Sequence, residues 1–238
     1  MAAEATPSFL FLPELPGPGS RLELPLTESH YVARVCRARP GEHVEATDGR
    51  GALAVLRLTR VRGGVAAEVV SITRQEPGRG AWVLCGPPEG ERADWLVEKL
   101  GELGILRFVP VDCDRAAWKR ARGRRGRWGR LAVAALRQSR RLQLMALDEP
   151  IRLEQALADL PAEATLWLAD ASGAAPAREP SGAASLAVGL VGPAGGLTDR
   201  ERDLALRKGF RPVCLSDARL RTETAALAWG AWWSGARG

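Results

Sequence analysis

The stretch Val188–Glu201 reads VGLVGPAGGLTDRE and joins an apolar strand to a helix through a turn rich in glycine. Its last four residues form the pattern of a capping box, in which the hydroxyl of Thr198 and the carboxylate of Glu201 hydrogen-bond to amides at a helix start. The sequence therefore predicts a strand that ends at Val191, a glycine loop, and a helix that runs to Lys208.

A glycine loop at the end of a strand can serve to bind a ligand. In an open α/β sheet, ligands bind beyond the carboxyl ends of the strands, where loops bring main-chain N–H and C=O groups against them. Gly192, Gly195 and Gly196 would let the main chain come close to a flat ligand, and Pro193 stiffens the turn. The loop matches neither nucleotide-binding fingerprint, because no Lys-Ser or Lys-Thr follows the glycines and no G-x-G-x-x-G is present. Such turns more often only connect a strand to a helix, so the loop alone does not establish a ligand.

The N-terminal part of the chain has a different pattern. From Phe9 to Arg74, short apolar runs alternate with turns such as Pro16–Gly19, which is typical of a small β-barrel. One predicted helix, over 28–37 with Thr27 as its N-cap, interrupts these strands.

Beyond a linker at Glu76–Gly80, apolar strands alternate with helical segments, which is the pattern of an α/β domain. The predicted strands cover 82–85, 105–111, 166–168, 186–191 and 213–215, and the predicted helices cover 92–103, about 128–144, 199–208 and 222–233. The chain has 238 residues, of which 46% are hydrophobic, so it can bury two cores. We therefore expect a β-barrel domain over 1–75 and an α/β domain over 80–238.

The composition argues against a membrane span and a metal centre. No stretch reaches the roughly 18 apolar residues of a membrane helix, so we expect a soluble, cytoplasmic protein. The four cysteines lie far apart without a C-x-x-C motif, and the only histidines are His30 and His43. A metal site therefore has few candidate ligands, and we expect buried, reduced thiols.

Positive charge is concentrated in one segment. The formal net charge is +6, and Arg115–Leu147 alone holds eleven Lys or Arg residues and no Asp or Glu. Such a segment suits a phosphate backbone, and Trp118 and Trp128 lie among the cations, where they could stack on bases. The alternative is an ordinary solvated loop, which most charged runs are. The arginines expected to contact RNA here are Arg122, Arg124, Arg125 and Arg127.

A second strand-to-helix junction points to a family. Leu215–Ala226 reads LSDARLRTETAA and resembles L-G-x-R-[IV]-L-R-x-E-T-A of the RsmE family, whose members methylate N3 of one uridine in small-subunit (16S) ribosomal RNA. The glycine loop resembles that family's G-P-E-G-G-[FL]-[ST]-x-x-E. Glu98–Gly104 is similar to K-x-x-E-L-G, Gln138–Arg141 to E-Q-S-x-R, and the segment 30–49 to H-x-x-x-V-L-R-x-x-x-G followed by D-G. The resemblance thus spans nearly the whole chain, in order.

The resemblance implies an architecture and a cofactor. RsmE proteins have a PUA-like β-barrel followed by a SPOUT methyltransferase domain, an α/β fold with a trefoil knot near its C-terminus, and they act as homodimers. S-adenosylmethionine is expected in the knot, held largely by main chain of the two loops. The implied cofactor residues are Leu168, Val191, Gly192, Pro193, Gly195, Gly196, Leu215, Ser216, Leu220 and Thr224. Further RNA contacts are expected from Arg34, Arg37 and Arg141, which lie in segments that carry the resemblance.

The implied reaction requires N3 of a uracil to lose its proton, so a cation near the base would favour the anion. We expect Arg221 to supply that charge, and Glu223 or Glu102 to act as a base or a positioning group. The alternatives are an ordinary acid at a helix N-terminus for Glu223 and a solvated or packing charge for Glu102.

Two other functions stay open at this point. Ala194 stands where the family pattern has Glu, and Ser216-Asp217 stands where it usually has Gly-Pro or Gly-Arg. These departures allow a non-catalytic RNA-binding or ribosome-assembly protein on the same scaffold. A methyltransferase with a shifted RNA target is the second alternative, because an arginine usual near the N-terminus is missing and the basic segment is enlarged. Cofactor binding distinguishes the first alternative from an enzyme.

Overall fold

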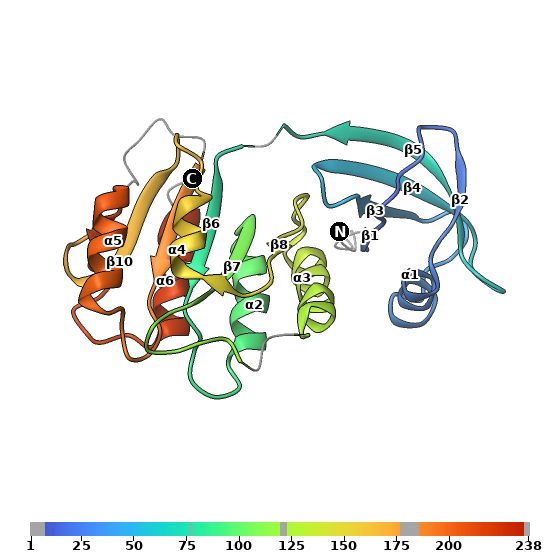
Figure 1. Cartoon of the computed structure of the whole chain (residues 1–238). Helices are drawn as coiled ribbons and strands as arrows, with labels where there is room; N and C mark the ends of the chain where they lie inside the picture. The colour runs from blue at the N-terminus through green and yellow to red at the C-terminus, as the bar shows by residue number, and fades with distance from the viewer. Residues whose placement is uncertain (1–7, 77, 120–122, 177–185, 236–238) are drawn as a thin grey trace. The chain divides into compact units, whose positions relative to one another are not determined.

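A computed structural model describes residues 8–76, 78–119, 123–176 and 186–235 (Figure 1). The chain divides into two compact units. Unit 1 comprises the residues up to Pro77 together with Leu136–Leu144, and unit 2 comprises Gly78–Ala135 and the chain from Met145 onward. A segment far along the sequence therefore completes the N-terminal unit.

Unit 1 is built on a five-stranded sheet with the order β1-β3-β4-β5-β2. Its strands are β1 (Phe9–Phe11), β2 (Arg21–Glu23), β3 (His43–Thr47), β4 (Ala52–Arg60) and β5 (Ala66–Arg74). β1 runs parallel to β3, and the other neighbours are antiparallel. Along β4, Ala54, Leu56 and Leu58 are buried whereas Arg57 is exposed, the alternation of a sheet with one face on a core.

The helical segment of unit 1 differs from the prediction. It consists of α1 (Leu26–His30) and a π-helical turn, η1 (Tyr31–Val35). The predicted helix over 28–37 with a Thr27 N-cap is therefore wrong at both ends, and the N-cap is Pro25, which makes no side-chain hydrogen bond. Because the π turn is wider than an α turn, Val32 is buried while Val35 is 64% exposed, so the two do not share a buried face.

Unit 2 is an α/β domain whose paired strands all run parallel. The strand order is β12-β10-β11-β6-β7-β8, and β9 pairs with β7. The strands are β6 (Gly80–Cys85), β7 (Arg107–Asp112), β8 (Ala146–Leu147), β9 (Ile151–Arg152), β10 (Thr165–Ala174), β11 (Leu186–Val191) and β12 (Arg211–Val213). Four of the five predicted strands are present, either close to their predicted bounds or longer than predicted. The fifth lies at Arg211–Val213 rather than 213–215, and β8 and β9 are additional.

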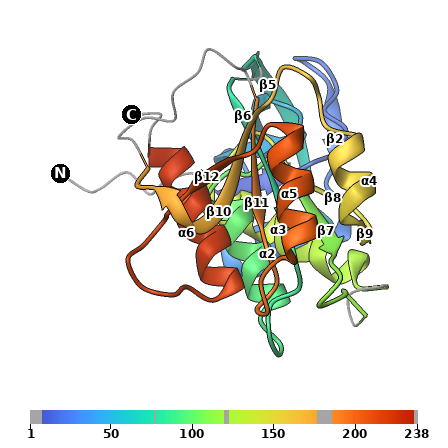
Figure 2. The ribbon, with the colours of Figure 1, turned by 60° about the vertical axis from the view of Figure 1, so that its left-hand side comes forward.

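Helices cover both faces of this sheet (Figure 2). They are α2 (Ala93–Glu102), α3 (Arg125–Ser139), α4 (Leu153–Ala158), α5 (Asp199–Lys208) and α6 (Thr222–Gly235). α4 and α5 lie over a core that includes Val188 and Leu190. α6 packs on the other face, where a Cβ at Gly189 would lie 2.4 Å from the ring of Trp229, so the packing requires glycine. Within the described parts of the chain, no helix is long and apolar enough to cross a bilayer.

The residues next to the ends of α5 and α3 explain where these helices begin and end. The capping box predicted at the start of α5 is present: the hydroxyl of Thr198 accepts from the N–H of Glu201, whose carboxylate accepts from the N–H of Thr198. Gly209, at a φ of +102°, ends this helix. α3 ends at Ser139 rather than near residue 144, because Arg140 adopts a left-handed φ of +53°.

Candidate active site

Two loops meet at the carboxyl ends of the parallel strands of unit 2. They are the glycine loop (residues 192–197), which follows β11, and the Arg219 loop (residues 214–221), which follows β12. The hydroxyl of Thr222, at the start of α6, donates to the carbonyl of Gly192 at 3.2 Å. Arg219 Nη2 donates to the carbonyl of Ala194 at 3.4 Å. The two stretches singled out in the sequence therefore form one site.

The glycine loop depends on small residues. Gly196 has a φ of +72°, in the left-handed region that side chains disfavour, and its N–H donates to the carbonyl of Pro193 at 2.7 Å. Gly86, just after β6, lies so close to the loop that a Cβ there would be 2.5 Å from the nitrogen of Pro193. The turn is thus fixed by a local hydrogen bond and by close packing against the neighbouring strand end.

A cavity of about 330 Å³ lies between the two loops. The predicted cofactor residues that line it are Leu168, Val191, Gly192, Pro193, Gly195, Gly196 and Leu220. Leu215 and Ser216 line an adjoining cavity of about 590 Å³, which shares Leu220 with the first. Thr224 is exposed on α6 and lines neither cavity. The volume, the apolar side chains of Leu168, Val191 and Leu220, and the bare main chain of the glycines fit a flat, uncharged ring system with a polar tail.

Three charged residues that line this cavity were not predicted from the sequence: Asp170, Arg202 and Arg219. Asp170, on β10, accepts a hydrogen bond from Arg202 Nε at 2.7 Å and from the amide of Ser172 at 2.8 Å. Burial alone would raise the pKa of Asp170, but these donors outweigh it and lower the pKa, so the carboxylate is ionised. The available signal was position: Asp170 follows the apolar run of a predicted strand, at the edge where ligands bind.

Known proteins match both units. The family described as RNA methyltransferase domain matches residues 75–234, and the one described as RNA methyltransferase PUA domain matches residues 27–70. The ribosomal RNA small subunit methyltransferase E of Mycobacterium bovis is 31% identical over 235 residues, which cover 91% of this chain and 87% of that protein. The chain belongs to this methyltransferase family, RsmE.

Two other members of the RsmE family are also similar to this chain over most of its length. The protein of the same name from Synechocystis is 28% identical over 208 residues, 85% of this chain and 69% of that protein. The crystal structure of ribosomal RNA small subunit methyltransferase E from Neisseria gonorrhoeae, bound to S-adenosyl methionine, has a TM-score of 0.83 to this chain. The two chains are 31% identical, and the match covers 95% of this one and 96% of the other. The fold is therefore a PUA-like domain followed by an RsmE-type α/β domain.

Two of the three predicted catalytic residues of this RsmE chain lie together. Arg221 and Glu223 line a cavity of about 220 Å³ that adjoins the glycine-loop cavity at Leu220. Arg221 is exposed, whereas Glu223 is buried and forms an ion pair with Arg92 at 3.2 Å. Glu89, on the loop after β6, lines the same cavity and was missed in the sequence. Its place in the loop that follows a predicted strand was the only signal for it.

Glu102 lies elsewhere, so the structure does not support a catalytic role for it. It ends α2 and forms an ion pair with Lys99 at 2.6 Å. Next to it, the carbonyl of Leu103 accepts from the hydroxyl of Ser234, in the last turn of α6. Since α6 begins at the cavity with Thr222, its last turn lies at the other end of a 14-residue helix, roughly 20 Å away. This position and the ion pair favour the alternative interpretation of Glu102 as a solvated or packing charge.

The expectation that Trp118 and Trp128 stack on bases is wrong. Their side chains are only 3% and 1% exposed, and their rings make edge-to-face contacts with each other and with Phe108. The indole N–H of Trp118 donates to the carbonyl of Cys85, and that of Trp128 donates to Asp94, both at 2.9 Å. The basic segment thus carries its tryptophans toward the core of unit 2, a direction that charge composition does not reveal.

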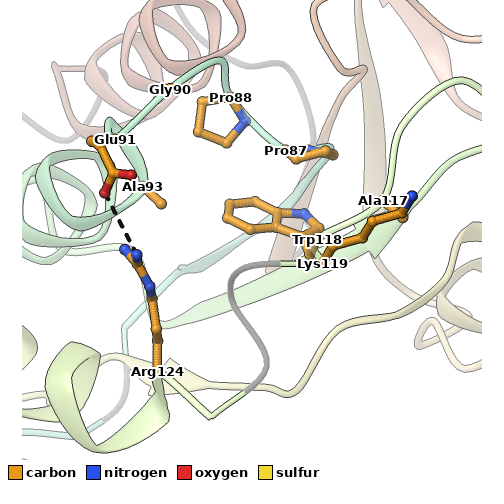
Figure 3. A pocket seen from close by; sticks show the side chains of 9 residues that line it. All are labelled: Pro87, Pro88, Gly90, Glu91, Ala93, Ala117, Trp118, Lys119 and Arg124. Carbon is orange, nitrogen blue, oxygen red and sulfur yellow. Dashed lines mark ion pairs between the residues drawn. The ribbon is translucent and has the colours of Figure 1, made fainter.

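The arginines of the basic segment are partly neutralised. Arg124 pairs with Glu91 at 3.5 Å beside a cavity of about 300 Å³ (Figure 3). Arg127 pairs with Asp94 at 2.5 Å, and Arg125 is exposed. These acidic partners come from the loop after β6 and from α2, outside the basic segment, so they balance charges that look unopposed in the sequence.

The other predicted RNA contacts that the structure describes belong to unit 1. Arg34 and Arg37 are exposed in unit 1, and Arg37 has a left-handed φ of +52°. Arg141, also in unit 1, is partly buried, and burial lowers its pKa. Arg122 lies outside the described residues.

All four cysteines are free, and two of them are buried. Burial raises the pKa of Cys113 to about 12 and raises the pKa of Cys85 as well, so both are thiols at neutral pH. Cys36 and Cys214 are partly exposed, so the expectation of burial is confirmed for half of them. Among the residues that the structure describes, no cluster of His, Cys, Asp or Glu is arranged to hold a metal ion.

Proposed function

We propose that this chain transfers a methyl group from S-adenosylmethionine to N3 of a uridine in small-subunit (16S) ribosomal RNA. The observation that carries the proposal is the cavity between the glycine loop and the Arg219 loop, with Arg221 in the adjoining cavity, in a member of the RsmE family. A relative named as a ribosomal RNA small subunit methyltransferase was crystallised with S-adenosyl methionine.

The residues present fit this cofactor. Main-chain groups of Gly195 and Gly196 can hydrogen-bond to a neutral adenosine, and Leu215, Ser216 and Leu220 can contact the adenine. When bound, S-adenosylmethionine supplies an activated methyl group. The chain supplies orientation, because the glycine loop has one fixed shape.

The cavity that adjoins the cofactor site supplies charge for the uracil. A uracil N3 attacks only as its proton leaves, and the exposed guanidinium of Arg221 can stabilise the anion that forms. A carboxylate of the same cavity, Glu89 or Glu223, accepts the proton. Glu223 is held by Arg92, which suits it to position Arg221 or the base.

The RNA contacts are divided between the two units. We propose that residues 1–75 form the RNA-binding domain, with Arg34 and Arg37 on its surface, and that residues 80–238 form the methyltransferase domain with Arg124, Arg125 and Arg127. From the family resemblance we further propose a cytoplasmic homodimer whose glycine loop and Arg219 loop belong to a trefoil knot.

The test combines binding with turnover. Calorimetry with S-adenosylmethionine should show binding, and incubation with small ribosomal subunits and cofactor labelled in the methyl group should transfer the label to RNA. Binding of RNA without binding of cofactor would support a non-catalytic RNA-binding protein instead. Transfer of label to another RNA, with none to small subunits, would support a shifted target.

A further inference from the structure

Arg115 contacts the glycine loop from a distant part of the chain. It lies between β7 and α3, 80 residues before the loop in sequence, and its Nη1 donates to the carbonyl of Gly195 at 2.8 Å. The same nitrogen donates to the carbonyl of Leu197 at 3.1 Å. A Cβ on Gly195 would lie 3.7 Å from both Cβ and Cδ of Arg115, so the stem of the arginine runs along the loop. One side chain therefore holds two carbonyls of the segment that lines the cofactor cavity.

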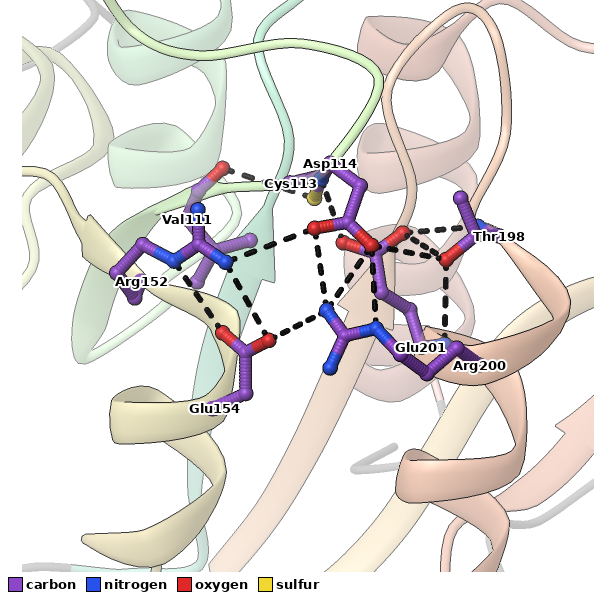
Figure 4. A network of polar contacts seen from close by, with 8 residues as sticks. All are labelled: Val111, Cys113, Asp114, Arg152, Glu154, Thr198, Arg200 and Glu201. Carbon is purple, nitrogen blue, oxygen red and sulfur yellow. Dashed lines mark hydrogen bonds and ion pairs between the residues drawn. The ribbon is translucent and has the colours of Figure 1, made fainter.

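The main chain that carries Arg115 is itself fixed to the start of α5 (Figure 4). The amide of Asp114 donates to the carboxylate of Glu201 at 2.8 Å, and the amide of Thr198 donates to the same carboxylate at 2.8 Å. Glu201 is 1% exposed, so water does not compete for these bonds. Arg200 adds ion pairs to Asp114 at 2.9 Å and to Glu154 at 2.6 Å. The side chain of Arg115 therefore extends from a main-chain segment that is held in place.

The capping box and Arg115 both act on the C-terminal half of the glycine loop. The capping box fixes Thr198, just after the loop, and Arg115 fixes the carbonyls on either side of Gly196, whose φ of +72° is the conformation that only glycine adopts readily. A loop with three glycines has much conformational freedom to lose, and a ligand that had to order it would bind more weakly. A loop that is already ordered avoids that loss.

We infer that Arg115 is a positioning residue that pre-organises the glycine loop for S-adenosylmethionine. The inference rests on the proposed function and goes beyond it, because it gives a residue of the basic segment a role in cofactor affinity rather than in RNA binding. Arg115 lines neither the cofactor cavity nor the cavity that holds Arg221, and it contacts the carbonyls of the loop. Its effect should therefore appear in binding rather than in the chemical step.

The experiment compares cofactor affinity in three variants of the full-length protein. Arg115→Ala should raise the Kd for S-adenosylmethionine by about ten- to a hundredfold, the range for loss of hydrogen bonds from a charged donor. Arg115→Lys, which keeps a cationic donor without the planar fork, should lie between Arg115→Ala and wild type. Arg207→Ala is the matched control, because it removes an exposed arginine in the last turn of α5. It should bind the cofactor as wild type does.

Kinetics separate positioning from a general loss of structure. Arg115→Ala should raise the KM for the cofactor and keep kcat close to wild type at saturating cofactor, because bound ligand then orders the loop. A structural role would instead lower the melting temperature of the ligand-free protein and leave the Kd of the folded fraction unchanged, and that result would overturn the inference. A fall in kcat with an unchanged Kd would overturn it too.

Failure of the inference differs from failure of the proposed function. If wild type and Arg115→Ala bind the cofactor equally well, Arg115 is not a positioning residue, and the proposed function stands. If wild type itself does not bind, the proposed function fails and the inference falls with it. Should Arg115→Ala not fold, Arg115→Met keeps most of the stem without the donor, and the same comparison of Kd applies.

Discussion

Arg221 is an exposed guanidinium in a cavity that it shares with Glu223 and Glu89, beside the cofactor cavity. Arg221→Ala should keep the Kd for S-adenosylmethionine and lower the single-turnover rate by about a hundredfold or more, because a group that stabilises developing charge acts on the barrier alone. Arg221→Lys should restore only part of the rate. The rate of Arg221→Ala should recover relative to wild type as pH rises, since hydroxide then helps to form the N3 anion. Loss of cofactor binding, or an unchanged rate, would instead make Arg221 a loop-ordering residue.

Asp48 shows a single carboxylate that fixes a turn in unit 1. It is buried, and its Oδ1 accepts from the amides of Arg50 at 2.7 Å and Ala52 at 3.1 Å. Burial alone would raise the pKa of Asp48, but these amides and the guanidinium of Arg74 outweigh it and lower the pKa. A depressed pKa means that Asp48 stabilises the fold above its unfolded pKa of about 3.9, and that this contribution is lost as pH falls through the folded pKa.

Asp48→Asn should therefore lower the free energy of unfolding by about 1–3 kcal/mol at pH 7. The difference from wild type should begin to shrink as pH falls below about 3.9, where the unfolded state binds a proton that the folded state binds only at lower pH. Urea denaturation of both proteins at several pH values measures it. If the difference in free energy of unfolding stays constant from pH 7 to pH 3, the shape of the Asp48 side chain, and not its charge, stabilises the turn.

At the scale of elements, the sequence predicts those features that interactions between neighbouring residues determine. The capping box at Thr198 and the strand β11 are present as predicted, because short-range hydrogen bonds and apolar runs determine them. The end of α3 was missed because Arg140 turns left-handed where its side chain pairs with Glu45, 95 residues away. Arg115 and Asp170 were missed for the same reason, since their partners lie far along the chain.

The aromatic cluster of β7 and α3 yields a prediction at this scale. Trp128→Ala should lower the free energy of unfolding by about 3–5 kcal/mol, because the side chain is 1% exposed and packs on Phe108 and Trp118. RNA affinity of the folded fraction should stay at the wild-type value. Trp95→Ala is the matched control, because Trp95 on α2 is 47% exposed. This substitution should lower the free energy of unfolding much less. If Trp128→Ala weakened RNA binding with stability kept, base stacking would be the correct interpretation after all.

At the scale of the whole molecule, family and architecture followed from motifs in both halves of the chain, whereas the distribution of charge did not follow from composition. The basic segment finds acidic partners on other elements, such as Asp94 on α2 and Glu91 just before it. Only folding brings these charges together, so the sequence overstates the free positive charge of the segment.

RNA binding should nevertheless depend on this segment. Replacement of Arg124, Arg125 and Arg127 by Ala should reduce the slope of log K against log salt by up to about 0.7–0.9 for each phosphate that is no longer neutralised. The total reduction should be smaller than three unpaired arginines would give, because Arg124 and Arg127 are paired with carboxylates. Titrations at several salt concentrations measure the slope, with Arg207→Ala as the control. An unchanged slope would place the RNA-binding surface elsewhere.

Methylation of uridine N3 in small-subunit ribosomal RNA is the reaction on which the proposed function depends. Mass spectrometry of nucleosides from mapped fragments of that RNA tests it most directly, in cells with and without the gene for this chain. We expect 3-methyluridine to be present with the gene, absent without it, and restored by wild type but not by Arg221→Ala. If 3-methyluridine is equally abundant in cells without the gene, the proposed function is contradicted.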